Sequence, residues 1–245
     1  MSGHSKWNNI KRKKEKTDGQ KAKIFTKMAR EIAVCVKESG SDPSTNGKLR
    51  DIIAKAKGLN VPNDNIERAI KKASEEKGDD YEAIKYEGYG PNGVAVIVET
   101  LTDNRNRTAG NMRHYFDKFG GNLGQVGCVG FLFNQKGVLV LNADGLDEEK
   151  VMEDCFEAGA EDFDMGEELI EITTNPQELG AVREAMEKMG YSFESSEVEY
   201  IPVTETALTN EEDIKKMGLL LEHLEDDDDV QNVWHNLENE EVLEN

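Results

Sequence analysis

A run of basic residues near the N-terminus is the clearest chemical feature of the sequence. Lysine and arginine side chains neutralise phosphates, and each contact releases counterions, so such binding depends on salt. Trp7 precedes the run and could stack on an exposed base. The residues of this region that we expect to contact nucleic acid are Lys6, Trp7, Lys11, Arg12, Lys13, Lys14, Lys16, Lys21, Lys23, Lys27 and Arg30.

The charge of the 245-residue chain is distributed very unevenly. The formal net charge is −20, yet residues 1–77 hold 19 Lys and Arg against 10 Asp and Glu, whereas the other 168 residues hold 11 against 40. This asymmetry is typical of a basic arm for a polyanion attached to an acidic body. Two alternatives remain open: a solvated basic tail, and a tail that pairs with the protein's own acidic residues.

A second group of cations lies in the acidic part, at the start of a predicted helix. Arg105, Arg107 and Arg113 stand there in a region that is otherwise poor in Lys and Arg. The planar guanidinium binds phosphate or carboxylate through two parallel hydrogen bonds. These arginines could equally pair with the neighbouring Asp103 and Asp117. We include Arg105 and Arg107 among the candidate nucleic-acid contacts.

The glycine-rich segments do not carry the geometry of a nucleotide site. Residues 88–93 match G-x-G-x-x-G literally, but Pro91 lies inside the motif and a strand is predicted to follow it, where the dinucleotide fingerprint requires a helix. A tight turn into a strand is therefore expected. The glycines between 120 and 130 lack the Gly-Lys-Ser/Thr ending of a phosphate loop. They more plausibly supply unusual backbone angles or the close approach of a partner.

No other residues form a recognisable catalytic or metal-binding pattern. The four histidines show no metal-ligand spacing with one another or with a cysteine, and no Ser–His–Asp arrangement stands out. The acidic run 226–229 could hold a divalent ion but is more typical of a solvated helix end. Cys128, among glycines, is the one thiol whose reactivity needs a check. We expect no enzyme, no metal site, no cofactor and no small-molecule substrate.

Bulk properties predict a soluble cytoplasmic protein. No run of about 18 apolar residues is present, so no membrane span is expected. The N-terminus lacks the apolar stretch of a secretory signal. Cys35, Cys128 and Cys155 are odd in number and far apart, which is typical of reduced thiols in a cytosol.

The first 78 residues should form a basic arm and three short helices. Residues 1–16 hold almost nothing apolar and are expected to be mobile. Apolar residues at three- and four-residue steps predict a first helix from Thr17 or Asp18 to Gly40, a second that Gly58 stops, and a third that opens near Pro62. Residues 78–80 are expected to form a linker.

The remainder predicts alternating strands and helices. Residues 86–93 should be a turn-rich lead-in, 94–101 a strand buried on both faces, 106–119 a helix and 131–133 a strand. Strands at 137–141, 162–164, 169–173 and 196–203, with helices at 148–158 and 176–189, give β-α-β-β-α-β, the ferredoxin-like order. A helix at 210–224 and a strand at 230–237 follow.

These elements predict an α+β multidomain fold in which one domain is inserted in another. The N-terminal helical domain covers residues 1–78. A discontinuous α+β domain covers 79–134 plus 205–245, and its late helix and strand would complete a second ferredoxin-like unit. A ferredoxin-like domain at 135–204 is inserted within it.

Several motifs together resemble the YebC family over essentially the whole length. They are GHSKW at 3–7 with the basic run after it, VPNDNIERAI at 61–70, YEGYGP at 86–91, TDNRNRT at 102–108 and DVQNV at 229–233. The resemblance implies three domains around a cleft, one helical and two α+β. It also implies nucleic-acid contact at Lys6, Trp7 and the basic run that follows.

The functions described for that family set the expectation for this chain. Its members are commonly described as probable transcriptional regulators, and some bind promoter DNA. A mitochondrial relative activates translation of a cytochrome oxidase subunit, and bacterial members have been tied to the ribosome. We therefore expect a non-enzymatic regulator that binds nucleic acid, as a DNA-binding transcriptional regulator. The alternative is a ribosome-associated translation factor that eases translation of proline-rich stretches. The expected partners are DNA or ribosomal RNA, with the ribosome possible and no membrane.

Overall fold

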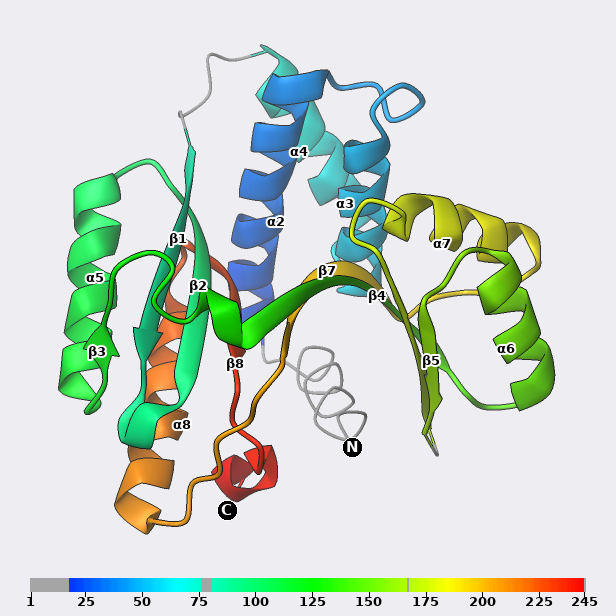
Figure 1. Ribbon diagram of the computed structural model, residues 1–245. Coiled ribbons are helices and arrows are strands. Elements are labelled where there is room, and N and C mark those ends of the chain that lie inside the picture. The colour runs from blue at the N-terminus through cyan, green and yellow to red at the C-terminus, as the bar shows by residue number, and fades with distance from the viewer. Residues whose placement is uncertain (1–17, 76–80, 167, 245) are drawn as a thin grey trace.

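The computed structural model describes residues 18–75, 81–166 and 168–244. A bundle of helices is followed by two four-stranded antiparallel sheets, and Figure 1 shows the helices above the space between the two sheets. The expected arm at 1–16 and linker at 78–80 lie outside the described residues. The predicted combination of N-terminal helices with α+β units is confirmed.

The helical unit consists of α2 (Asp18–Ser39), α3 (Gly47–Gly58) and α4 (Asn63–Glu75). The chain leaves α2 through Gly40, whose φ of 88° is favourable only without a side chain. The side-chain oxygen of Asn46 caps α3 by accepting a hydrogen bond from Leu49 N at 3.1 Å. The predicted apolar stripes form one core, whose buried members are Met28, Ile32, Cys35, Val36, Leu49, Ile52, Ala56, Val61 and Ile66.

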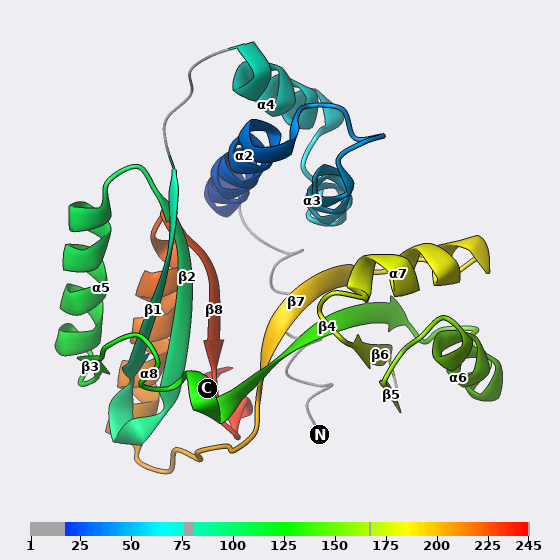
Figure 2. The ribbon, with the colours of Figure 1, turned by 45° about the horizontal axis from the view of Figure 1, so that its top comes forward.

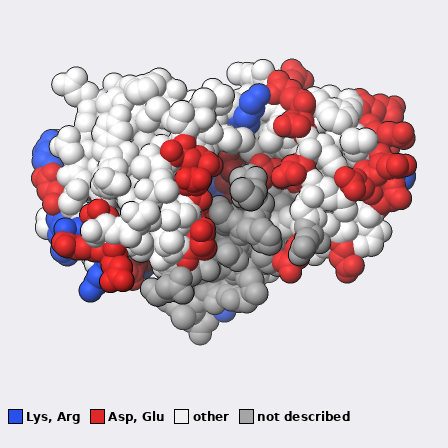
Figure 3. All heavy atoms as spheres, turned by 60° about the horizontal axis from the view of Figure 1, so that its bottom comes forward, with Lys and Arg blue, Asp and Glu red and all other residues white. Residues whose placement is uncertain are grey.

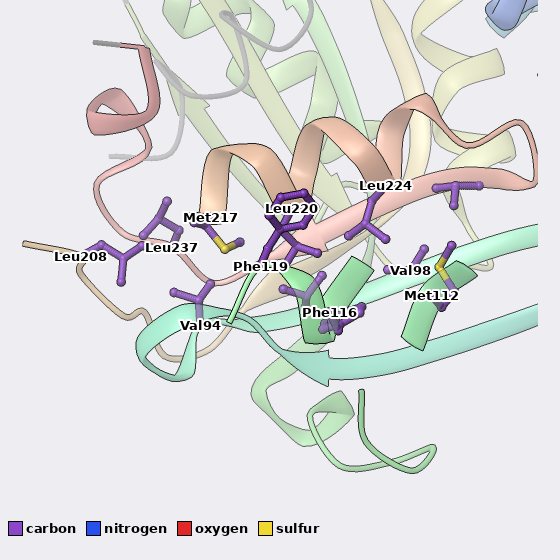
Figure 4. Packing of buried hydrophobic residues seen from close by; sticks show 12 residues of the cluster. Val94, Val98, Met112, Phe116, Phe119, Leu208, Met217, Leu220, Leu224 and Leu237 are labelled. Carbon is purple, nitrogen blue, oxygen red and sulfur yellow. The ribbon is translucent and has the colours of Figure 1, made fainter. Parts of the chain in front are cut away.

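The first sheet has the strand order β3-β1-β2-β8. Its strands are β1 (Glu82–Tyr89), β2 (Ala95–Thr102), β3 (Asn122–Leu123) and β8 (Val230–His235). Two helices, α5 (Arg105–Lys118) and α8 (Glu211–Asp226), pack on one face of it. Figure 4 shows Met112 and Phe116 of α5 meeting Met217, Leu220 and Leu224 of α8 over that face.

Strand β2 is buried on both faces, as the sequence predicted. Val96 and Val98 point into the core under α5 and α8, whereas Ala95 and Ile97 point into a second cluster on the other face. All four are 0% exposed. The second cluster includes Tyr200 from the other sheet, so it also joins the two sheets.

The second sheet has the strand order β5-β6-β4-β7. Its strands are β4 (Phe133–Asn142), β5 (Asp162–Met165), β6 (Leu169–Thr174) and β7 (Ser195–Pro202), with α6 (Glu148–Glu157) after β4 and α7 (Leu179–Lys188) after β6. This is the predicted order of helices and strands for the segment. The chain leaves the first sheet after β3 and returns to it through α8 and β8.

Two sequence predictions in the first sheet are wrong. The expected lead-in at 86–93 belongs largely to β1, which pairs with β2 along its whole length, from Glu82 opposite Thr102 to Tyr89 opposite Ala95. The strand carries the alternation Ile84-Lys85-Tyr86-Glu87, but the glycines and proline of 88–93 directly after it favour a turn and obscure it. The expected strand at 131–133 is also absent, since Gly130–Leu132 forms a 3-10 turn and β4 begins at Phe133.

Shorter segments complete the described chain. Gly88 and Tyr89 end β1, and residues 90–93 make the predicted turn into a strand, through a 3-10 turn at Pro91–Gly93. Another 3-10 helix, Glu240–Glu244, follows β8. Within the described residues, no helix has the length and apolar character needed to cross a membrane.

Candidate nucleic-acid interface

The structure describes six of the thirteen residues predicted to contact nucleic acid. Lys6, Trp7, Lys11, Arg12, Lys13, Lys14 and Lys16 lie outside the described residues. Lys21, Lys23, Lys27 and Arg30 lie on α2, and Arg105 and Arg107 lie at the start of α5. Arg30 and Arg107, which are 77 positions apart in the sequence, are brought together on one carboxylate.

That carboxylate is Asp229, and we call its surroundings the Asp229 junction (Asp229, Arg30, Arg107, Thr102 and Thr108). Arg30 Nη1 lies 2.6 Å from Asp229 Oδ1, and Arg107 Nη2 lies 2.8 and 2.7 Å from the two oxygens. The hydroxyls of Thr108 and Thr102 lie 2.7 and 3.2 Å from Oδ2. The Asp229 side chain is only 3% exposed, so this charge is paired and shielded from water.

Four elements place these groups. The side-chain oxygen of Asn104 caps α5 by accepting from Arg107 N at 3.1 Å, which orients the first turn of the helix. Thr102 ends β2, and Asp229 directly precedes β8, whose pairing with β2 sets the two ends side by side. Leu101 N donates to the carbonyl oxygen of Asp229 at 2.8 Å. Arg30 then reaches in from α2, so the junction fastens the helical unit to the first sheet.

Arg30 makes further contacts that fix it in place. Its Nη1 donates to the carbonyl oxygens of Leu101 and Asp228 at 3.1 and 2.8 Å, and its guanidinium lies 5.4 Å from the ring centre of Tyr81. A guanidinium held by this many acceptors on its own chain cannot bind a phosphate without breaking them.

The electrostatics of Asp229 and Arg107 reflect this pairing. Burial alone would raise the pKa of Asp229, but the hydrogen bonds from Arg107, Thr108 and Arg30 outweigh it and hold the pKa below its ordinary value. The hydrogen bonds to Asp229 and then to Asp103 raise the pKa of Arg107. Both groups therefore keep their charges at neutral pH.

A shallow depression of about 440 Å³ surrounds the junction. Its lining carries three cations and five carboxylates, namely Lys23, Arg30, Arg107, Asp103, Asp226, Asp227, Asp228 and Asp229. Lys23 Nζ pairs with Asp226 at 2.9 Å, and Lys27 Nζ donates to the carbonyl oxygen of Glu225 at 2.7 Å. An excess of carboxylates repels phosphate. In the structure, Lys23, Arg30 and Arg107 pair with acidic residues of the protein itself, which is one of the alternatives that the sequence left open.

Two predicted residues remain directed to solvent. Arg105 has a 70% exposed side chain and only a 3.4 Å ion pair with Glu82. Lys21, near the start of α2, is also exposed. Exposed ion pairs contribute little free energy, so Arg105 can turn to another anion at low cost.

A second set of ion pairs fastens the helical unit to the second sheet, and sequence reasoning missed it. In what we call the Lys55 junction (Lys55, Glu31 and Glu197), Lys55 Nζ of α3 lies 3.1 Å from Glu31 Oε1 of α2 and 3.5 Å from Glu197 Oε2 of β7. Burial alone would lower the pKa of Lys55, but the two carboxylates raise it. Lys55 lies three positions after the buried Ile52, which places the two on neighbouring parts of the helix surface, and this spacing is the available signal.

Arginines extend this contact between the helical unit and the second-sheet segment. Arg183 of α7 pairs with Asp51 of α3, and Arg50 of α3 pairs with Glu184 of α7 at 3.1 Å. The Arg183 side chain is 8% exposed, whereas Arg50 and Glu184 are both nearly half exposed. Much of the charge on α3 is therefore matched across the interface.

Sequence reasoning also missed Glu87, whose carboxylate holds the glycine-rich loop. Glu87 is 1% exposed, and its Oε2 accepts hydrogen bonds from Val129 N at 3.0 Å and Gly130 N at 2.8 Å. Lys85 Nζ lies 3.0 Å from its Oε1. Burial raises the pKa of the neighbouring Cys128 thiol, which lowers its thiolate fraction and its reactivity at neutral pH.

The acidic run at 226–229 does not form a metal site in the described part of the chain. Asp229 is occupied by two guanidiniums, and no group of three or more His, Cys, Asp or Glu side chains there is placed to hold a metal ion.

Comparisons with known proteins found matches over most of the chain. Residues 5–76 match the family described as TACO1/YebC protein N-terminal domain, and residues 81–237 match TACO1/YebC second and third domain. A "probable transcriptional regulatory protein" of Acetivibrio thermocellus is 57% identical over 96% of this chain and 98% of its own length. One of Ruminiclostridium cellulolyticum with the same name is 58% identical over 100% and 99%. A crystal structure of a conserved hypothetical protein from Aquifex aeolicus superposes with a TM-score of 0.81 at 46% identity, over 91% of this chain and 92% of that one.

Proposed function

The chain belongs to the TACO1/YebC family, and from this premise we propose that it is a non-enzymatic, cytoplasmic regulator that binds nucleic acid through its N-terminal arm. Its relatives carry the name probable transcriptional regulatory protein. The proposed activity is DNA binding that regulates transcription, without a small-molecule substrate.

The segregation of charge is the observation that carries this proposal. Residues 1–17 hold six Lys and Arg against one Glu, on a chain whose last 168 residues carry 11 cations against 40 acids. Counterion release makes such an arm attractive to a nucleic-acid backbone. The acidic body repels the same backbone, and this restricts where a polyanion can approach.

The contacts of the described cations narrow the proposed interface. Lys23, Lys27, Arg30 and Arg107 are held by the acidic segment 225–229, so we assign them to fastening the helical unit. The proposed phosphate contacts are the arm together with Lys21 and Arg105, whose side chains are exposed. Arg68 and Lys72 extend the surface, because they are exposed one turn apart on α4.

The test compares two charge reversals of equal size. One variant changes Lys11, Lys13 and Lys14 to Glu, and the control changes the exposed Lys150, Lys188 and Lys215 of the acidic body to Glu. Fluorescence anisotropy with a labelled 20-base-pair duplex is measured between about 50 and 200 mM salt. We expect the arm variant alone to lose affinity roughly 10- to 100-fold, with a shallower salt slope. Equal losses of affinity in both variants would mean that the net charge of the protein, and not the position of the arm, causes the effect.

A sedimentation experiment distinguishes a role in transcription from a role in translation. Lysate that contains wild type or the arm variant is run on sucrose gradients at low and high salt. For the proposed transcriptional role, we expect the protein to stay at the top of the gradient and a subset of duplexes to outcompete random ones, since base contacts and DNA shape carry the sequence information. Wild type that travels with ribosomes, with the arm variant left at the top, would favour the translation factor.

We also propose a finer description of the two sheets. The strand order β5-β6-β4-β7 with the chain order β4-α6-β5-β6-α7-β7 supports a ferredoxin-like domain at about 133–202. The first sheet supports a permuted version, because β3-β1-β2-β8 repeats that spatial order with β1 moved to the beginning of the chain. Under this description the second sheet is inserted in the first unit, between β3 and α8.

A further inference from the structure

The segment that runs from the end of α5 through β3 and the following loop to just after β4 differs from the rest of the body in charge. Residues 118–143 contain no Asp or Glu. Acids make up 50 of the 245 residues, so a stretch of this length would hold about five on average. It is the longest acid-free stretch of the chain, and it lies within the acidic part. A negatively charged ligand that the body repels elsewhere meets no carboxylate of this segment.

The same loop exposes large apolar side chains. Phe131 is 73% exposed and Val126 is 74% exposed. Val203, which is 58% exposed, lies close to Phe131 in the chain pairing, because its backbone N donates to the carbonyl oxygen of the adjacent Leu132 at 2.8 Å. Figure 3 shows a broad area without charged side chains on the side of the molecule that carries the first sheet. No described part of the chain covers Phe131.

Several hydrogen bonds fix the backbone of this loop. The buried Glu87 carboxylate accepts from Val129 N and Gly130 N, and the Glu87 carbonyl oxygen accepts from Gly124 N at 2.8 Å. The Tyr89 hydroxyl donates to the carbonyl oxygen of Cys128 at 3.2 Å.

The packing is too tight for a side chain at one of the loop glycines, Gly124. A Cβ at Gly124 would collide with Cys128 Sγ, and one at Gly130 would lie 3.4 Å from the Glu87 oxygens. The loop therefore presents Phe131 in one arrangement, and a ligand does not have to order it.

We propose that this face binds the bases of single-stranded nucleic acid, with the ring of Phe131 as a stacking platform. Every base has a π-face, so a rigid exposed ring can bind bases without reading their sequence. The loop itself carries no carboxylate that would repel the backbone, and Val126 and Val203 are exposed apolar side chains. The inference rests on the proposed nucleic-acid function and adds a contact on the body to the arm.

The test uses the full-length protein and substitutions at one exposed position. The probe is a labelled 12-nucleotide single strand of mixed sequence, as RNA and as DNA, in fluorescence anisotropy. We expect Phe131→Ala to weaken binding at least about fivefold, Phe131→Leu to do the same, and Phe131→Trp to retain binding. The matched control is Phe156→Ala, since Phe156 of α6 is 47% exposed and lies outside the acid-free stretch. It should leave affinity unchanged.

A spectroscopic readout distinguishes stacking from a general apolar contact. The fluorescence of 2-aminopurine in the strand should fall on binding to wild type and to Phe131→Trp, and should fall less with Phe131→Ala. The salt slope should be the same for all four variants, because no phosphate contact changes.

Each alternative outcome has a separate meaning. If wild type binds strands and Phe131→Ala binds equally well, the inference is overturned while the proposed function stands. If Phe131→Leu matches wild type, the contact is apolar, as for a protein partner, and stacking is overturned. If wild type binds neither strand nor duplex, both the inference and the proposed function fail.

Discussion

The helical unit is attached to the two sheets by junctions that use charge differently. At the Asp229 junction, one carboxylate that is 3% exposed serves two guanidiniums and two hydroxyls. On the side of the second sheet, Lys55 is shared by two carboxylates that are 15% and 21% exposed, and further pairs stand apart from it, such as Arg50 with Glu184, both nearly half exposed. The first attachment depends on one buried carboxylate, whereas the second is spread over Lys55 and several separate, more exposed pairs.

The difference indicates at which junction a single substitution should most lower the free energy of unfolding. Removing the shared acceptor takes the common carboxylate from both cations. Arg30, which is 15% exposed, then keeps only carbonyl oxygens as acceptors, whereas Arg107 keeps its pair with Asp103. A poorly compensated charge in a shielded place is costly. Removing one of several exposed pairs loses little, because water and salt replace the partner. Comparison of the two junctions therefore predicts a graded series of effects.

The largest effect is expected for Asp229→Asn. It keeps the shape of the side chain but removes the charge that Arg30 and Arg107 share, so we expect the free energy of unfolding to fall by about 3–5 kcal/mol. Urea unfolding followed by circular dichroism measures it. The control is Asp228→Asn, whose side chain is exposed and whose carbonyl oxygen keeps its bond to Arg30. Equal losses for the two variants would contradict a concentrated junction.

Lys55→Met should have the next largest effect. The change leaves Glu31 and Glu197 facing each other without a cation, and their partial exposure reduces the cost to about 2–3 kcal/mol. Lys57→Met is the matched control on the same helix, because Lys57 is exposed. If Lys55→Met unfolds at the same urea concentration as the control, this ion pair contributes nothing measurable.

The dependence of the free energy of unfolding on acid pH should reveal the contribution of the Asp229 junction. The pKa of Asp229 is lower in the folded state than its ordinary value of 3.8, so its contribution is complete above that value and is lost as pH falls through the folded pKa. The stability difference between wild type and Asp229→Asn should therefore shrink below about pH 4. Unfolding curves between pH 7 and about pH 2 measure this. A difference that stays constant would show that the charge is not the source of the effect.

The smallest effect is expected for Arg50→Gln. Its ion pair with Glu184 is nearly half exposed, so we expect a loss of about 0.5 kcal/mol or less, which disappears at high salt. Thermal unfolding at low and high salt is sufficient to measure it. A loss comparable with that of Lys55→Met would make the second junction concentrated as well.

The elements that the sequence predicted correctly are those with local signals. The three-helix unit follows from apolar spacing, and the double burial of β2 follows from its run of β-branched residues. The pairing of Arg107 with Asp103 was among the alternatives because the two are four residues apart. Asp229 lies 122 positions from Arg107, and only the pairing of β2 with β8 brings it there. No local sequence pattern predicts the register in which β2 pairs with β8.

The glycine-rich loop shows the same limit. Its glycines and its lack of acids are visible in the sequence, but the group that shapes it is Glu87 on a neighbouring strand. A glutamate in a predicted turn gives no sign that it will be buried. Strand β1 is hard to predict for a different reason, because its last residues run into the glycines and proline of 88–93, which favour a turn.

The return of the chain to its first sheet also orders the events of folding. The second sheet is contiguous from β4 to β7 and can close as soon as those residues are available, whereas β2 must wait for β8, as in the pairing of Val98 with Val233. Pairings between residues so distant are slow, because a long loop must close first. During synthesis the first sheet therefore starts before the second and is finished after it. The attachment of α2 through Asp229 belongs to the final step.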